Sequence, residues 1–216
     1  MAFLLRARPF LAFVPWVTSV FLWSAASGTI PLVTAAFLVL AGLFGWTLIE
    51  WVLHRAMHLH VRWAAVSRFQ DQAHLRHHRE PHDVEHSVVM LRASIPLSVV
   101  FFGLALLLVR ELDAALLFHA GLLVGYLAYE FVHLATHAKW RLPGLGFLAR
   151  YHNLHHFRGW NRTFGVTTPL WDWVFGTLPV IRAAAVQAFE EDPRARCAEG
   201  ARDADQAVDS LLPSKN

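Results

Sequence analysis

The chain has 216 residues, of which 56% are hydrophobic and 16% are charged, so it fits one domain but not an ordinary water-soluble globule. A single cysteine, Cys197, excludes an internal disulfide and any site built from several thiolates, which leaves nitrogen and oxygen as metal ligands. The formal charge of +3 comes from basic residues that flank apolar runs, without the basic stripe that binds nucleic acid, so we expect no nucleic-acid partner.

Four apolar stretches have the length that a membrane-spanning helix needs, which is roughly 20 residues with a range of about 17–25. They are residues 9–26, 30–49, 93–109 and 114–132. Only Ser27-Gly28-Thr29 separates the first two stretches, and only Arg110 to Asp113 separates the last two, so each pair forms a hairpin with a short turn. Residues Arg55 to Arg92 and everything after Ala138 then lie on the same side of the membrane as the amino terminus.

The distribution of basic residues assigns that side. Of the 19 arginines and lysines, only Arg110 lies in a turn between paired spans, and ten follow Ala138. Because basic residues concentrate in cytoplasmic segments, we expect the side that holds the amino terminus, Arg55 to Arg92 and the residues after Ala138 to be cytoplasmic. A cleaved signal peptide is an alternative for the start, because Arg6 and Arg8 precede an apolar run that ends in small residues. That run is long for a signal peptide and leads directly into another span.

Histidines carry the strongest signal in the chain. Ten of the fourteen form four boxes, namely His54-x-x-x-His58, His74-x-x-His77-His78, His133-x-x-x-His137 and His152-x-x-His155-His156. A spacing of three or four residues places imidazoles on one helical face, about a turn apart, where two can bind one ion. Two boxes follow the second and fourth spans, and the other two lie in segments that return to the same side. The boxes therefore predict a two-metal centre with up to five nitrogens per ion, and neutral imidazole suits iron, zinc and copper.

Other metal architectures fit less well. The chain has no His-Glu-x-x-His, and Glu130-x-x-His133 supplies only half of a ferritin-like carboxylate motif. We expect Glu50 and Glu130, each about one turn before a histidine, to accept a hydrogen bond from a ligating ring, or else only to cap locally. His82 and His86 are further candidates for supporting the ligands, whereas His60 and His119 are assigned to the surface and to a span interior.

With these boxes the chain resembles the fatty acid hydroxylase / sterol desaturase superfamily of integral-membrane, non-haem di-iron oxygenases. The likeness runs from about Gly45 to Thr177 and rests on the first, second and last boxes and on the stretch from Asn161 to Thr177. It implies an all-α fold, with a four-helix membrane stem and a cytosolic helical cap whose histidines surround two iron ions. It also implies O2-dependent oxidation of a membrane lipid. Zinc can take the same nitrogen ligands and replace iron in a preparation.

Some details depart from or extend the family pattern. The first box is shorter than the His-x-x-x-x-His of some members. We expect no fused haem-binding electron-transfer domain, so the resemblance implies a separate donor of cytochrome b5, ferredoxin or flavoprotein type. In the stretch ending at Thr177, we expect Trp171, Trp173 and Phe175 to supply apolar area at the membrane interface. Asp172 either orients a ligand histidine or fixes a turn by accepting backbone amides.

These observations predict one hydroxylase-like membrane domain over residues 1–182 and a polar tail over 183–216 without stable structure. We expect hydroxylation of a fatty acyl chain, with position 2 favoured because metals just above the hydrocarbon edge meet carbons near the headgroup. Desaturation, and oxidation of a sterol or carotenoid ring, are the enzymatic alternatives. A histidine-rich metal transporter would place its ligands inside the spans, and a bis-histidine haem protein would leave most of the boxes unused.

Overall fold

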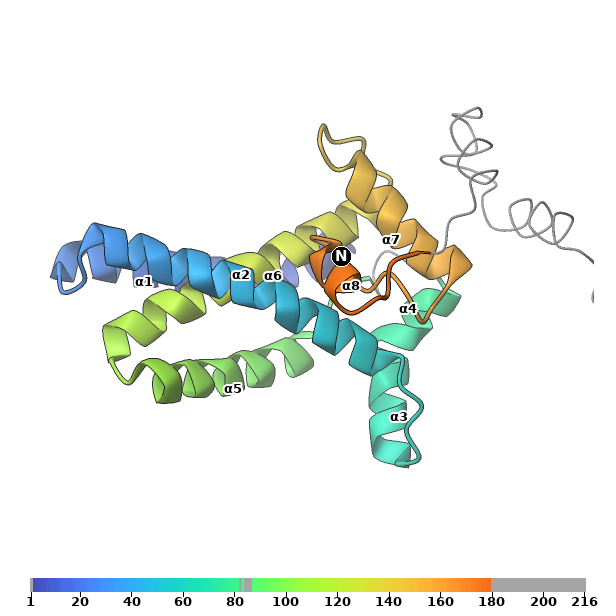
Figure 1. Ribbon diagram of the computed structural model, residues 1–216, viewed down its shortest axis with the longest axis horizontal. Coiled ribbons are helices and arrows are strands. Elements are labelled where there is room, and N and C mark those ends of the chain that lie inside the picture. Colours follow the sequence, from blue (N-terminus) through green and yellow to red (C-terminus); the bar gives the residue numbers. More distant parts are fainter. Residues whose placement is uncertain (1, 82, 84–86, 180–216) are drawn as a thin grey trace, which may run out of the picture.

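The computed structural model describes residues 2–81, 83 and 87–179 (Figure 1). Its four long helices are α1 (Ala2–Ser27), α2 (Leu32–Met57), α5 (Leu91–Val109) and α6 (Leu112–His137). Each is long and apolar enough to cross a membrane, and the described residues contain no strand. The predicted fold class, an all-α membrane protein with four spans, is confirmed. The predictions for the tail 183–216 lie outside the described residues.

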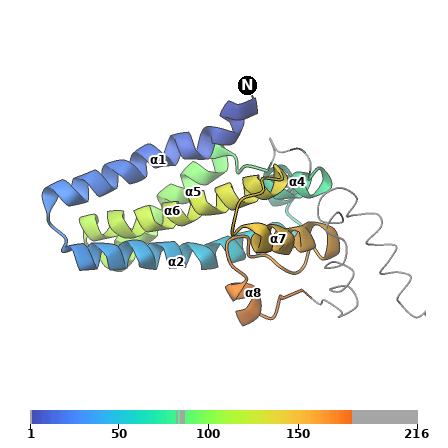
Figure 2. The same ribbon diagram turned by 90° about the horizontal axis from the view of Figure 1, so that it is seen from above.

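Helix α6 is the centre of the bundle, because α1, α2 and α5 all pack against it (Figure 2). In its most apolar stretch 67% of residues are buried, compared with 11% in the corresponding stretches of α2 and α5. The two outer helices therefore present most of their apolar surface to lipid, as a spanning helix requires.

Small residues set the distance between α2 and α6. A Cβ atom added to Gly42 would lie 2.0 Å from the carbonyl oxygen of Phe118, and one added to Gly121 would lie 2.2 Å from that of Val39. Close backbone approach at small residues is a common basis of helix association in membranes. It also fixes the register of two helices that run in the same direction, so His54 and His133 both lie twelve residues beyond these glycines.

The shorter elements form a cap at one end of the bundle, and the two tight turns lie at the other end (Figures 1 and 2). The cap comprises α3 (Ala64–Gln70), a π-helical turn η1 (Asp71–Leu75), α4 (Arg76–Arg79), α7 (Gly146–Arg158) and α8 (Leu170–Val174). At the far end, the turn before α6 is closed by Arg110 in the left-handed conformation at φ 64°. All four histidine boxes consequently lie at the cap end.

The observed helices run further than the expected spans. Helix α2 continues eight residues beyond Ile49 to Met57, and α6 continues five beyond Val132 to His137. The uninterrupted apolar runs end near Ile49 and Val132, but the helical backbone hydrogen-bonding continues into the cap. These extensions carry His54 and His133 on the same rigid rods that anchor the protein in the bilayer.

Candidate metal centre

The ten boxed histidines come together in two groups of five, each with ligand atoms within 4.8 Å of one another. Group 1 comprises His54, His58, His74, His78 and His155, and group 2 comprises His77, His133, His137, His152 and His156. All are buried except His58, which is partly exposed. Each group holds enough nitrogen donors for one ion and contains no carboxylate.

Each His-x-x-His-His box serves both groups. His74 and His78 are four residues apart and share one face, whereas His77 points about 100° away around the helix and joins group 2. In α7 the assignment is reversed, because His152 and His156 join group 2 and His155 joins group 1. The pair His54 and His58 at the end of α2 completes group 1, and the pair His133 and His137 of α6 completes group 2. Each group therefore has two histidines from one His-x-x-His-His box, one from the other box, and one His-x-x-x-His pair.

The spacing of the ring nitrogens fits metal ligation. In group 1 the Nε2 atom of His74 lies 3.0 Å from that of His58 and 2.8 Å from that of His78. In group 2 the Nε2 atom of His137 lies 3.0 Å from that of His77 and 3.1 Å from that of His152. Two nitrogens at about 2.1 Å from one ion and at right angles to each other lie about 3.0 Å apart. Both groups have this separation.

Hydrogen bonding alone does not satisfy these rings. The Nδ1 of His155 donates to the carbonyl oxygen of Arg162 at 2.7 Å, so its Nε2 is a lone-pair acceptor that faces other ring nitrogens. The Nε2 of His54 is buried without a hydrogen-bond partner among the described residues. A shared cation would satisfy these lone pairs, and the donor set therefore fits a metal ion.

Burial favours the neutral form of several boxed histidines in the cap. Burial lowers the pKa of His58 to about 4, and burial with mutual repulsion holds the pKa of His74, His152, His155 and His156 well below the usual value. Neutral imidazole is the form that binds metals, so the site needs no deprotonation step before loading.

Backbone carbonyls orient three of the rings from behind. The Nδ1 of His54 bonds to Phe164 O at 2.5 Å, and that of His155 bonds to Arg162 O at 2.7 Å. The Nδ1 of His137 bonds to Pro81 O at 3.1 Å. An Nδ1–H held in this way leaves Nε2 free for the metal and fixes the plane of the ring.

The loop that supplies two of these carbonyls is held by Asp172. One carboxylate oxygen accepts the amide of Phe164 at 2.9 Å and the other accepts that of Gly165 at 2.8 Å. The same carboxylate also accepts bonds from three side chains, namely Trp51, Tyr151 and Thr177. A Cβ atom on Gly165 would lie 2.0 Å from Thr168 O, so only glycine fits here. Asp172 thus fixes the turn, which is one of the two roles that we expected, and through the backbone of Phe164 it also positions His54.

The two buried glutamates also accept backbone amides of loops. Glu50 accepts the amides of Val166 and Thr167 and the hydroxyl of Thr167, and Glu130 accepts the amide of Val89 at 3.1 Å. Among the described residues neither carboxylate receives the bond from a ligating ring that we expected. The physical reason is that each carboxylate points from its helix toward backbone amides of a neighbouring loop, which it accepts instead. His82 and His86 lie outside the described residues.

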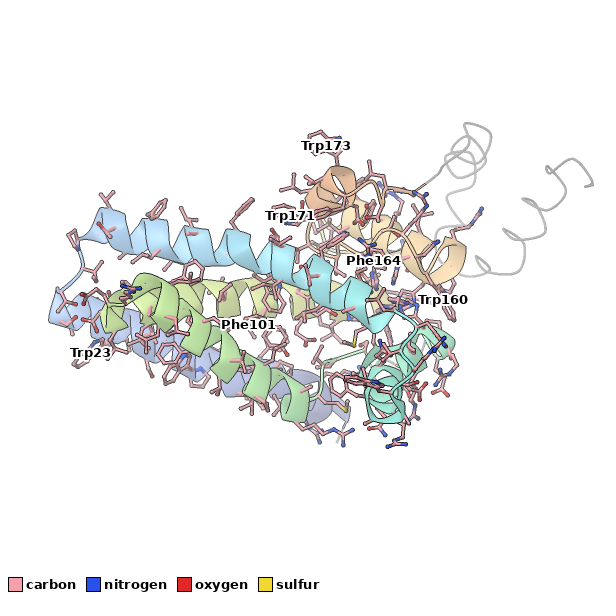
Figure 3. All side chains as sticks on the ribbon, turned by 60° about the horizontal axis from the view of Figure 1, so that its bottom comes forward. Trp23, Phe101, Trp160, Phe164, Trp171 and Trp173 are labelled. Carbon is pink, nitrogen blue, oxygen red and sulfur yellow. The ribbon has the colours of Figure 1, made fainter. Side chains whose placement is uncertain are left out.

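An apolar cavity of about 230 Å³ opens onto group 1. Of the ten boxed histidines only His54 and His74 line it, and Phe101 of α5 points into it from the opposite side (Figure 3). Sequence reasoning did not find this cavity, nor the roles of Trp51 and Tyr151 at Asp172, because these residues lie on separate elements and no helical spacing rule connects them. The only sequence signal was the density of aromatic residues near the boxes.

The fold and site define a membrane protein of the histidine-box class, with paired five-histidine groups at one end of a four-helix stem. A fatty acid hydroxylase family model matches residues 39–177. The chain is 36% identical to dihydroceramide fatty acyl 2-hydroxylase FAH2 of Arabidopsis thaliana, over 80% of this chain and 73% of that protein. It is 35% identical to ceramide very long chain fatty acid hydroxylase SCS7 of Saccharomyces cerevisiae, over 66% of this chain and 38% of that protein.

A solved structure of full-length scs7p, with only the hydroxylase domain visible, superimposes with a TM-score of 0.74 at 30% identity. It covers 81% of this chain and 66% of that one. The chain therefore belongs to the fatty acid hydroxylase family and is an oxidoreductase. It is an integral membrane protein with histidine groups that could hold metal ions.

Proposed function

We propose that this protein is a di-iron oxygenase that hydroxylates carbon 2 of a fatty acyl chain in a membrane lipid. The observation that carries the proposal is the apolar cavity, which begins at His54 and His74 and extends into the membrane-spanning part of the bundle. An acyl chain in this cavity has its methyl end in the membrane and its carboxyl end near group 1. One relative named above is a fatty acyl 2-hydroxylase and the other is a ceramide very long chain fatty acid hydroxylase, which agrees with this orientation.

The proposed reaction consumes one O2, two electrons and two protons for each C–H bond converted to C–OH, and releases one water. Two iron ions, one in each group, would supply the oxygen activation, because all-imidazole donor sets suit iron. The chain's own residues perform the remaining tasks. Backbone carbonyls keep the rings of His54, His137 and His155 in the tautomer that ligates. The apolar wall formed by Leu122, Leu123 and Phe101 holds the acyl chain and excludes water.

Lipid reaches the cavity from the bilayer. Met57 of α2 and Leu97 of α5 line it and are partly exposed, and Phe69 of α3 lines it and is exposed. These three residues mark a border of the cavity at the protein surface. Helices α2 and α5 each pack against α6, and both are exposed along most of their apolar length, which agrees with entry from the bilayer. We further propose that the cap and both histidine groups face the cytoplasm, that residues 1–182 form one domain, and that a separate donor of cytochrome b5, ferredoxin or flavoprotein type supplies the electrons.

Lipid extracts from knockout cells and from cells complemented with the full chain test the proposal by mass spectrometry. We expect an acyl species heavier by one oxygen only in the complemented cells, with fragmentation that places the hydroxyl next to the carboxyl carbon. A product that is desaturated, or hydroxylated on a ring, contradicts the proposal. A His155→Ala variant provides the control, because it keeps the fold elements but loses a ring of group 1.

A further inference from the structure

The far end of the cavity lies deep in the membrane-spanning bundle. Ser98 and Phe101 of α5 and His119 of α6 line that end. His119 lies fourteen residues before His133, and His133 is level with His54 in the register set by Gly42 and Gly121. At about 1.5 Å per residue, this far end, which we call the floor of the cavity, is therefore about 21 Å from His54 along the helix axis.

The floor is polar although its surroundings are apolar. The His119 side chain is 3% exposed, and its Nε2 lies 3.1 Å from both the hydroxyl and the carbonyl oxygen of Ser98. The ring of Phe102 covers it, with centroids 5.3 Å apart. The other ring nitrogen, Nδ1, is buried without a hydrogen-bond partner among the described residues. A polar pair at this depth is costly and marks a functional position more often than a neutral one.

We propose that the His119–Ser98 pair is the stop that sets the length of the acyl chain this enzyme accepts. This inference rests on the proposed function and adds a specificity-determining pair to it. The helix rise places the floor about 21 Å from group 1. An extended alkyl chain advances about 1.3 Å per carbon, so this distance corresponds to about 16 carbons beyond the oxidised position. The pair joins α5 to α6 across the end of the cavity, and a terminal methyl group that reached it would have to displace a polar contact.

A purely structural role for the pair makes a different prediction. If His119 and Ser98 only fasten α5 to α6, removing either side chain lowers stability and total turnover without changing which chain lengths are used. If they form the floor, a smaller residue at position 119 deepens the cavity and a larger residue at position 98 makes it shallower. The two changes then move the product lengths in opposite directions, which loss of a fastening cannot do.

The experiment uses the full chain expressed in membranes and an equimolar mixture of acyl lipids that differ only in chain length. We expect His119→Ala to lengthen the mean 2-hydroxylated chain by roughly two to four carbons, because truncation leaves a cavity about one ring deep. We expect Ser98→Leu to shorten it by a similar amount. Leu116→Ala is the matched control, because Leu116 lies one turn from His119 on α6 but does not line the cavity.

The outcomes separate the two proposals. If the unaltered chain makes no 2-hydroxylated product, the proposed function fails. If it makes the product but both variants keep its length distribution, or both shift it in the same direction, the length-stop proposal is overturned. A shift in Leu116→Ala equal to that in His119→Ala also overturns it, because general loosening of α6 would then account for the change.

Discussion

The two histidine groups have matching composition but different surroundings. Group 1 faces the cavity through His54 and His74, and two of its rings are oriented by the loop that Asp172 and Glu50 hold. Group 2 contributes no ring to the cavity wall, and His137 is oriented by Pro81 from the segment before α5. Similar donor sets are therefore placed in unlike positions, and we infer that group 1 is the side that meets substrate.

The largest expected effect is the loss of one ring from either group. We expect His155→Ala in group 1 and His77→Ala in group 2 each to reduce turnover more than about 100-fold, beyond the 10- to 100-fold typical when only a supporting residue is lost. Metal analysis should find two ions per chain in the unaltered protein and about one in each variant. Full activity in His77→Ala would show that group 2 is dispensable and would contradict the expectation that both groups are needed for turnover.

A smaller effect, confined to one group, is expected from Asp172→Asn. The two carboxylate oxygens of Asp172 together accept five hydrogen bonds. In the variant an NH2 group, which cannot accept, replaces one of these oxygens, so the loop that carries Arg162 and Phe164 loses part of its support. We expect group 1 to bind metal about 10- to 100-fold more weakly, with group 2 unchanged. Tyr151→Phe is the control, because it removes one of the five bonds and should cost only about 1 kcal/mol of stability. Equal metal loss from both groups would contradict the assignment of this loop to group 1.

The two glutamates give a matched pair of still milder changes. Glu50 receives three bonds from the loop near group 1, whereas Glu130 receives the amide of Val89. We expect Glu50→Gln to lower the free energy of unfolding by about 1–3 kcal/mol, the typical cost of leaving a buried partner unsatisfied, and Glu130→Gln to cost less. Thermal unfolding in detergent measures both variants. A larger loss of stability in Glu130→Gln than in Glu50→Gln would mean that the number of accepted hydrogen bonds does not determine the stability contribution of these glutamates.

The smallest effect on activity is expected from the probes of membrane side. In a Cys197→Ala background, a cysteine at Leu112, which is 56% exposed at the turn end, should react only with reagent added outside the cell. A cysteine at Arg79, on the exposed surface of the cap, should react only after the membrane is opened. Reaction of Arg79→Cys with external reagent would place both groups on the opposite face from the one we propose.

Local patterns in the sequence were enough for the spans and for the four boxes. Apolar length and short turns predicted the hairpins, and helical spacing predicted that boxed histidines share faces. The division into two groups was not predictable, because it depends on the rotation of α4 and α7 relative to α2 and α6. The π-helical turn that carries His74 changes this rotation. The residue types in Asp71–Leu75 do not predict a π-helical turn.

The supporting contacts were predicted less well, for a related reason. Glu50 and Glu130 were singled out by their distance from a histidine, but their partners include backbone amides of distant loops, which one helix cannot reveal. Asp172 was left between two roles, and the structure combines them, since its bonds to two amides place the carbonyl that holds His54. Side-chain spacing predicts neighbours on one helix, whereas these contacts depend on how separate segments meet.

The sharing of α4 and α7 between the two groups makes the protein far less tolerant of insertions than of substitutions at these helices. Replacing one histidine removes one ligand from one group. Adding a single residue between His74 and His77 would rotate the following side chains by about 100°, so that His77 and His78 would both leave their groups. The same holds between His152 and His155. Length changes should therefore be confined to segments such as 139–145, where the chain leaves α6 and has not yet entered α7.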